Sequence, residues 1–388
     1  MKNFPNILWI SCLGFSMLAG CSSNSETQSI EEKTASAIAT VEETVDNGLE
    51  EIEKTGLYNT IDLASQYDTL LSKIQSNLVK GTYHSDEYSL DIPYGVYVPE
   101  DYDSTLDYPL VMFIPDSTLA GQDVNAILEQ GYGGVVWAAP EVQTGREAII
   151  LYPAYPEVTV DDHNGYTITD YVPATIGLID QIREDYNIDS NRIYATGQSM
   201  GCMTSMILAA DNPDLFAACM FVDGQWDANA LASLATQTFV YFAAQDDTSA
   251  FTGMSQAIPV WEENGADIVQ AEWSGEWDHT QLEEAAHQML KEDSKIYCIS
   301  WETGTITPKK MGMGGSGKEG NFRKMDGSDG PSGAFEPSDS ENPSQVGNDL
   351  SMTSGQPQGM NSVAYHMASF DYAYKCNTMV AWLLLQRK

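Results

Sequence analysis

The chain has 388 residues, 43% of them apolar, which is enough to bury the core of one large domain or of two. Its 56 acidic residues outnumber its 18 basic residues, so the formal net charge at pH 7 is −38. Such a charge repels phosphate groups, and this argues against binding to nucleic acid and against docking by charge on anionic membranes.

The N-terminus has the pattern of a targeting segment. Lys2 precedes an apolar stretch over residues 7–18, which is too short to span a bilayer. The tetrapeptide LAGC, which ends at Cys21, looks like a bacterial lipobox. This resemblance implies a lipoprotein signal peptide over residues 1–20, a lipid on the Cys21 sulfur, and a place at the cell surface or the periplasmic face of a membrane. A secretory signal with a coincidental cysteine is the alternative.

We predict an acidic linker with one helix over residues 21–80. Residues 22–56 are polar and acidic, whereas apolar residues recur with a helical period over residues 60–78. The helix would pack either on the following domain or in a stalk, and the linker would tether that domain to the membrane.

The pattern from residue 81 onward is that of an α/β domain, which we assign to residues 81–388. Short apolar runs typical of strands alternate with segments of helical period. The predicted strands cover residues 88–98, 108–114, 134–138, 148–153, 193–196, 218–222, 239–243 and 296–301, and the predicted helices cover residues 172–186, 202–210, 228–235 and 281–290. This alternation indicates a mostly parallel central sheet with helices on both faces, where sites form at the carboxyl ends of strands.

One motif, Gly197-Gln198-Ser199-Met200-Gly201, lies between a predicted strand and a predicted helix. In this context G-x-S-x-G is a nucleophile elbow, a tight turn that exposes the serine hydroxyl above the sheet. The glycines two places before and after the serine let the strand and the helix approach closely. We therefore predict that Ser199 is a nucleophile and that the backbone amide of Met200 stabilises an oxyanion.

A serine nucleophile needs a histidine base and a carboxylate that orients the histidine. Three histidines follow Ser199 in the chain. His279 is the first residue of a predicted helix and His287 lies inside it, so we expect both side chains to be solvated and not catalytic. His366 follows the last predicted strand and comes just before a terminal helix predicted over residues 370–386, and we predict that it is the base.

Three aspartates are candidates for the acid, because each follows a predicted strand. Asp223 follows residues 218–222, and Asp246 and Asp247 follow residues 239–243. Of the last two, either is placed to reach the histidine, and the other would cap a turn or a helix.

Residues 304–360 are rich in Gly, Ser, Pro and Met and show little apolar periodicity. We predict a disordered surface insertion, with a lid or a wall-contacting segment as the alternative.

Four cysteines lie beyond Cys21, and their spacing is not that of a metal site. We predict neither a metal nor a cofactor. Cys202 and Cys219 fall in apolar runs and are predicted to be buried thiols, and the pairing of Cys298 with Cys376 stays open.

Five segments, residues 94–99, 108–114, 197–201, 245–254 and 365–367, carry a resemblance to a known group. From about residue 88 onward the chain resembles the secreted α/β-hydrolase esterases of the polyhydroxybutyrate-depolymerase and feruloyl-esterase-like group, some of which are labelled peptidases. The resemblance implies the α/β-hydrolase fold. It also implies that the acid is Asp247, the aspartate just before Thr248, in a triad with Ser199 and His366.

The chain departs from this group after the strand over residues 108–114. Relatives carry His-Gly or His-Asp there, whereas this chain has Pro115-Asp116. Because proline has no N–H, the second oxyanion donor would be the backbone amide of Asp116 or Ser117.

The predicted function is that of a lipid-anchored extracytoplasmic serine hydrolase of carboxylic esters, among them acyl or feruloyl esters on polysaccharide. The alternatives are a non-catalytic surface lipoprotein that binds glycan or cell wall through a degenerate cleft, and a serine peptidase. Trp137, Gln198 and Trp226 are predicted to line a substrate pocket, and Trp273 is a further candidate. For each tryptophan, the alternative is that it packs in the core or at the rim of the pocket.

Overall fold

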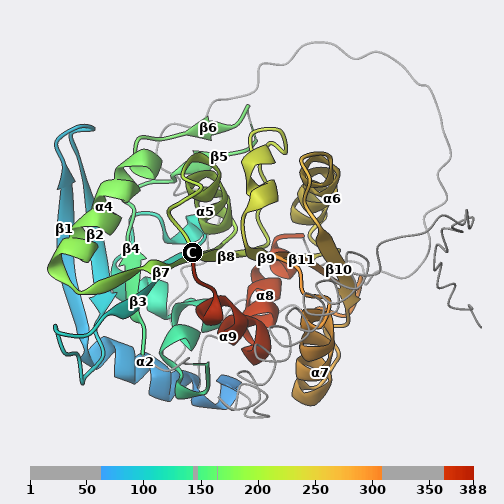
Figure 1. Cartoon of the computed structure of the whole chain (residues 1–388), viewed down its shortest axis with the longest axis horizontal. Helices are drawn as coiled ribbons and strands as arrows, with labels where there is room; N and C mark the ends of the chain where they lie inside the picture. The colour runs from blue at the N-terminus through green and yellow to red at the C-terminus, as the bar shows by residue number, and fades with distance from the viewer. Residues whose placement is uncertain (1–62, 143–146, 164, 308–361) are drawn as a thin grey trace, which may run out of the picture. The chain divides into compact units, whose positions relative to one another are not determined.

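A computed structural model describes residues 63–142, 147–163, 165–307 and 362–388 (Figure 1). The predicted signal peptide, the lipobox and most of the predicted linker lie outside the described residues. The predicted insertion is described only for residues 304–307.

A nine-stranded sheet forms the centre of the fold, in the order β1-β2-β4-β3-β7-β8-β9-β11-β10. Its strands are β1 (Leu78–Ser85), β2 (Leu90–Tyr97), β3 (Tyr108–Ile114), β4 (Ile149–Pro153), β7 (Ile188–Gln198), β8 (Ala218–Val222), β9 (Phe239–Ala244), β10 (Ile268–Trp273) and β11 (Ile296–Trp301). Strand β2 runs antiparallel to both of its neighbours, and every pair from β4 to β10 is parallel. This arrangement confirms the predicted α/β-hydrolase fold.

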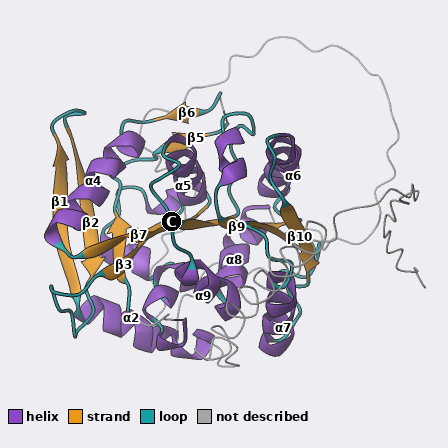
Figure 2. Cartoon of the chain, in the orientation of Figure 1, coloured by secondary structure: helices purple, strands orange, loops and turns teal. Residues whose placement is uncertain are grey.

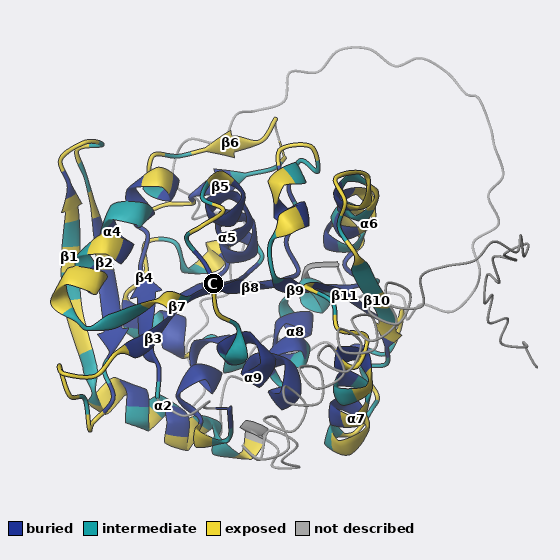
Figure 3. Cartoon of the chain, in the orientation of Figure 1, coloured by how far each residue is buried: buried dark blue, intermediate teal, exposed yellow. Residues whose placement is uncertain are grey.

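The central strands are buried on both faces, which explains their continuous apolar runs. Every residue of β3, β4, β8, β9 and β11 is buried (Figure 3). Alternate residues of β3 point to opposite sides: Val111 and Phe113 join one apolar cluster, whereas Leu110 and Met112 join the other.

Helices cover both faces of the sheet (Figure 2). On one side α4 (Tyr171–Asp185), α5 (Met200–Asp211) and α6 (Thr248–Glu263) contribute to one apolar cluster. On the other side α2 (Tyr67–Ser76), α3 (Val124–Leu128), α7 (His279–Leu290), α8 (Ser362–Tyr374) and α9 (Asn377–Leu385) contribute to the other cluster. Among the described residues, no helix is long and apolar enough to cross a membrane.

The domain begins before residue 81, where the sequence analysis placed its start. Strand β1 pairs with β2 from Leu78 onward. Helix α2 buries Leu70 and Ile74 in the apolar cluster, so the helix predicted over residues 60–78 packs on the domain and not in a stalk. Strand β1 was not predicted from the sequence, because most of its residues are exposed or half-buried and show no clear alternation of apolar and polar residues.

The strand predicted over residues 134–138 is wrong, because this segment forms two 3-10 turns, η3 (Tyr132–Gly134) and η4 (Val136–Ala138). All five of its residues are buried. A short apolar run buried on every side looks the same in a sequence whether it is extended or helical. The helix predicted over residues 228–235 is likewise a 3-10 segment, η6 (Ala232–Thr236).

The terminal helix predicted over residues 370–386 is two helices, α8 and α9, and His366 lies inside α8 instead of before it. The buried Glu283 carboxylate of α7 accepts hydrogen bonds from the amides of Asn377 (2.7 Å) and Thr378 (2.8 Å). It therefore satisfies the first amides of α9 and stabilises a second helix start at this place.

The four described cysteines, Cys202, Cys219, Cys298 and Cys376, are free and buried. Cys298 and Cys376 are therefore not paired in this structure. Burial raises the pKa of the Cys298 and Cys219 thiols, which keeps both neutral.

Candidate active site

The predicted nucleophile lies in a one-residue turn. Strand β7 ends at Gln198 and helix α5 begins at Met200, so Ser199 alone joins them. Its backbone has φ 54° and ψ −119°, outside the regions that residues with a side chain ordinarily occupy. The Ser199 amide donates to the Val222 carbonyl of the neighbouring strand at 3.0 Å. The strained conformation of an elbow is thus held by the sheet.

The two motif glycines are needed because the backbone is crowded on both sides of the turn. A Cβ on Gly197 would lie 2.4 Å from the carbonyl carbon of Gly201, and a Cβ on Gly201 would lie 2.0 Å from the carbonyl oxygen of Ile114. The second contact matters for the site, since it lets the loop after β3 rest against the start of α5.

The structure brings Ser199, His366 and Asp247 together from three elements. Nε2 of His366 lies 2.8 Å from Oγ of Ser199, and Nδ1 lies 2.5 Å from Oδ2 of Asp247. His366 comes from α8, and Asp247 from the turn between β9 and α6, where its other oxygen accepts from the Ala250 amide. In this arrangement Nε2 of His366 can accept the serine proton while Nδ1–H stays bonded to the Asp247 carboxylate.

The electrostatics of the site favour imidazole as a base. Burial by itself lowers the pKa of His366, but the hydrogen bond to Asp247 and the charges of Asp247, Asp223 and Asp116 outweigh it, and the pKa is raised above its ordinary value. A raised pKa strengthens the imidazole as a proton acceptor at neutral pH.

The three candidate acids occupy different positions. Asp246 is half-buried and accepts from the Gly304 amide at 2.7 Å. Asp223 is fully buried, and its Oδ1 accepts from the Ala244 amide at 2.7 Å. Burial and the neighbouring charge of Asp247 raise the pKa of Asp223 to about 7. The hydrogen bond from His366 goes to Asp247, which is the position that the resemblance implied.

The amide of Met200 opens α5 beside Ser199, and the loop that carries the amides of Asp116 and Ser117 lies against the same helix start. The Asp116 carboxylate is buried, and its Oδ1 accepts from the Thr118 amide at 2.6 Å. The Thr118 amide is therefore occupied within the loop, and the donors that the sequence predicted, Asp116 and Ser117, precede it.

Two of the predicted pocket tryptophans are core residues. Trp137 is fully buried, its indole N–H donates to the Gly133 carbonyl at 2.8 Å, and its ring meets Tyr374 edge-on. Trp273 packs against Trp301 in the same apolar cluster. Both side chains belong to one apolar cluster, where large apolar area gains most by leaving water.

Gln198 ends β7 directly before Ser199, and Trp226 lies in the segment that follows β8. Trp226 is 5% exposed and meets Tyr166, which is 45% exposed, edge-on at a centroid distance of 5.0 Å. Gln198 is buried, and its amide donates to Oε1 of Gln130 at 2.6 Å. Sequence reasoning missed Gln130, because a glutamine in a loop that lies 68 residues before its partner leaves no local signal.

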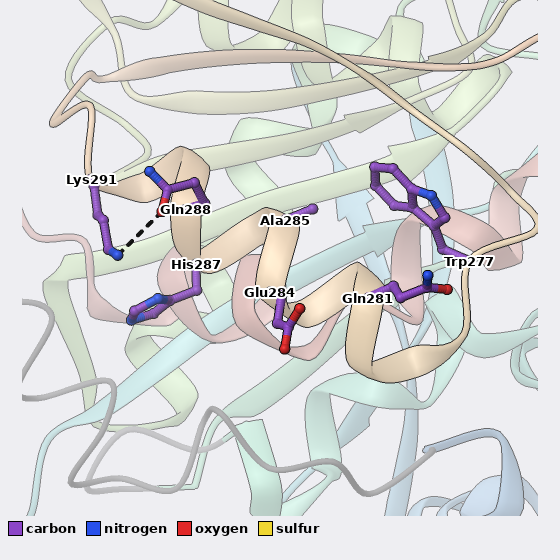
Figure 4. A pocket seen from close by; sticks show the side chains of 7 residues that line it. All are labelled: Trp277, Gln281, Glu284, Ala285, His287, Gln288 and Lys291. Carbon is purple, nitrogen blue, oxygen red and sulfur yellow. Dashed lines mark hydrogen bonds between the residues drawn. The ribbon is translucent and has the colours of Figure 1, made fainter. Parts of the chain in front are cut away.

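The other two histidines that follow Ser199 lie on α7, away from the triad. His279 Nδ1 is 3.7 Å from Oε1 of Glu283. His287 lies on the face of α7 that lines a surface hollow (Figure 4). The hollow is lined by Trp277, Gln281, Glu284, Ala285, His287, Gln288 and Lys291. No triad residue contributes to this lining.

Comparisons with known proteins match parts of this chain. A sequence profile of the prolyl oligopeptidase family matches residues 157–268, a segment that includes Ser199 and Asp247 but ends before His366. Poly(3-hydroxyalkanoate) depolymerase C of Paucimonas lemoignei is 29% identical over 98 residues, which are 25% of this chain and 20% of the depolymerase.

Among solved structures, a thermostable esterase is 25% identical with a TM-score of 0.48, over 60% of this chain and 56% of the esterase. A feruloyl esterase module from Clostridium thermocellum, complexed with sinapinate, is 14% identical with a TM-score of 0.38, over 58% of this chain and 81% of the module. The chain therefore spans a fifth of the depolymerase and little more than half of the thermostable esterase.

Proposed function

We propose that this protein, an α/β-hydrolase that resembles serine esterases, hydrolyses carboxylic esters through Ser199, His366 and Asp247. One observation carries the proposal: the unbroken series of contacts from Asp247 through His366 to Oγ of Ser199, at 2.5 and 2.8 Å. An isolated G-x-S-x-G turn would leave the hydroxyl a weak nucleophile, whereas a serine with an oriented base is activated.

The reaction follows from these positions. Oγ of Ser199 attacks the ester carbonyl carbon while Nε2 of His366 takes the hydroxyl proton. The amide of Met200 and the amide of Asp116 or Ser117 donate to the oxyanion. His366 then protonates the leaving alkoxide, an acyl group stays on Ser199, and a water activated by His366 releases it. Asp247 accepts the Nδ1–H throughout and stabilises the imidazolium.

A carboxylic ester with an acyl or feruloyl group, free or attached to polysaccharide, is the substrate class we propose. The depolymerase relative supports an ester, because its name describes a polyester. Tyr166 is 45% exposed and meets the buried Trp226 edge-on, so Tyr166 offers an aromatic surface on which a feruloyl group could stack. Peptide hydrolysis is the second candidate, since the family profile that matches residues 157–268 is that of prolyl oligopeptidases.

A substrate panel tests the proposal. We expect the purified protein to hydrolyse p-nitrophenyl acetate and methyl ferulate faster than aminoacyl p-nitroanilides, and to be labelled by a fluorophosphonate probe. Faster cleavage of the anilides would favour the peptidase. A protein that neither reacts with the probe nor turns over any ester would instead favour the non-catalytic alternative, a surface protein that binds glycan.

We also propose that the protein is anchored to a bacterial membrane through a lipid on Cys21, on the strength of the LAGC sequence alone. Cys21→Ala should move the protein from the membrane fraction to the soluble fraction, because the acyl chains that hold it are lost. Cys12→Ala is the matched control: Cys12 lies in the predicted signal peptide, so the mature protein should stay with the membrane. Retention of Cys21→Ala in the membrane fraction would contradict the anchor.

A further inference from the structure

A short series of side-chain hydrogen bonds connects the nucleophile elbow to the loop after β3. The amide of Gln198 donates to Oε1 of Gln130 at 2.6 Å, and Nε2 of Gln130 donates to Oδ2 of Asp116. Oδ1 of Asp116 accepts from the Thr118 amide at 2.6 Å. Gln198 and Asp116 are 2% and 1% exposed, so water has little access to either end of the series.

The two ends belong to the machinery proposed above. Gln198 is the last residue of β7 and precedes Ser199 directly. Asp116 lies in the loop that carries the second oxyanion donor, two residues beyond Ile114, which pairs with Gly197. Gln130 itself belongs to neither strand; it follows α3 and bonds to Gln198 at the end of β7 and to Asp116 in the loop after β3.

Asp116 depends on these partners. Burial raises the pKa of its carboxyl group, whereas its bonds to Thr118 and Gln130 and the charge of His366 act in the opposite direction. A buried carboxylate oxygen that loses its donor is costly to keep in place. Without Gln130 the Asp116 side chain would turn toward another donor, and the backbone amides of Asp116 and Ser117 would turn with it.

We propose that Gln130 is a positioning residue that fixes the oxyanion loop, residues 115–118, relative to Ser199. It contacts no reacting atom and acts through Asp116 on one side and Gln198 on the other. The inference rests on the proposed serine-hydrolase function. The proline at position 115 makes such a positioning residue necessary. Because Pro115 supplies no N–H, a single amide of the following residues must be held in place.

Gln130→Ala and Gln130→Met test the assignment, the second because it keeps the size of the side chain. We expect kcat for p-nitrophenyl acetate to fall about 10- to 100-fold in both variants, since a misplaced or missing oxyanion donor costs up to about 10²–10³-fold. KM should change less than about threefold, because the loop acts on the transition state and not on the bound substrate.

An arylboronic acid, which forms a tetrahedral adduct on the serine, supplies a second readout. Its affinity should fall in parallel with kcat in the Gln130 variants, an effect that a purely structural role would not produce. Glu129→Ala is the matched control. Glu129 is the exposed neighbour of Gln130, and within the described part of the chain its side chain accepts a hydrogen bond from Gln75 at 3.3 Å and not from the oxyanion loop. It should keep the wild-type kcat.

Wild-type kcat and boronate affinity in Gln130→Met would overturn the proposal, and so would a rise in KM with unchanged kcat. An equal loss in Glu129→Ala would do the same, because the effect would then come from a disturbed loop. If the wild-type protein hydrolyses no ester and takes up no fluorophosphonate, the proposed function itself fails, and this outcome is distinct from the others.

Discussion

Replacing Ser199 with alanine is expected to abolish ester hydrolysis while the protein stays folded. Only Oγ is removed, and this atom is the proposed nucleophile, which His366 contacts at 2.8 Å. The backbone bond from Ser199 to Val222 does not depend on the side chain. In another serine hydrolase, loss of the triad serine lowers kcat by about 10⁶-fold, so p-nitrophenyl acetate turnover and fluorophosphonate labelling should both vanish.

Ser255→Ala is the control for this variant. Ser255 is an exposed serine of α6 whose hydroxyl donates to the Phe251 carbonyl at 2.8 Å, and its removal should leave kcat unchanged. If Ser199→Ala retains more than roughly a tenth of the wild-type kcat, where triad serines account for far larger factors, another group is the nucleophile.

Replacing Asp247 with asparagine is expected to lower kcat by at least about 10²-fold, since the same change in a well-studied triad lowers it by about 10⁴-fold. The carboxylate accepts the Nδ1–H of His366 and so leaves Nε2 free to take the serine proton. An amide of the same size favours the opposite tautomer, in which Nε2 carries the proton and cannot act as a base.

Asp246→Asn and Asp223→Asn are the matched variants, and each should cost less than about tenfold, an order of magnitude below the loss of a triad contact. Asp246 bonds to the Gly304 amide away from the imidazole. Asp223 accepts from the Ala244 amide, and an asparagine oxygen can accept the same bond. The kcat values of the three folded variants at neutral pH decide the matter. If Asp223→Asn lost activity while Asp247→Asn kept it, the triad acid would be Asp223, which follows β8.

Several elements could be predicted because their signal is local. Buried parallel strands such as β3 and β8 are continuous apolar runs, and the sequence analysis matched their bounds. The elbow was recognisable because a tight turn between strand and helix demands glycine at fixed spacing around the serine. The edge strands β1 and β10 were missed, since half-exposed strands lack both the apolar run and a clear alternation.

The sequence identified the partners of Ser199 only in part. Chain order and the position of aspartates after strands narrowed the choice, and the resemblance then selected Asp247. The distances that unite Ser199, His366 and Asp247 come from the fold, since His366 is 167 residues from Ser199 and 119 from Asp247. His366 was expected before a single terminal helix and lies within α8, because the terminal helical region begins earlier than predicted and is divided into α8 and α9.

The sequence by itself determined what short-range physics imposes: apolar runs for buried strands, glycines where the backbone is crowded, and a serine at a strained turn. The tertiary structure alone decided which side chains meet across those elements. It placed Trp137 in the core instead of a pocket and joined Gln130 to Asp116 and Gln198. The physical reason is that a hydrogen bond or a packing contact depends on distance in space, and residues far apart in the chain leave no joint pattern in one sequence.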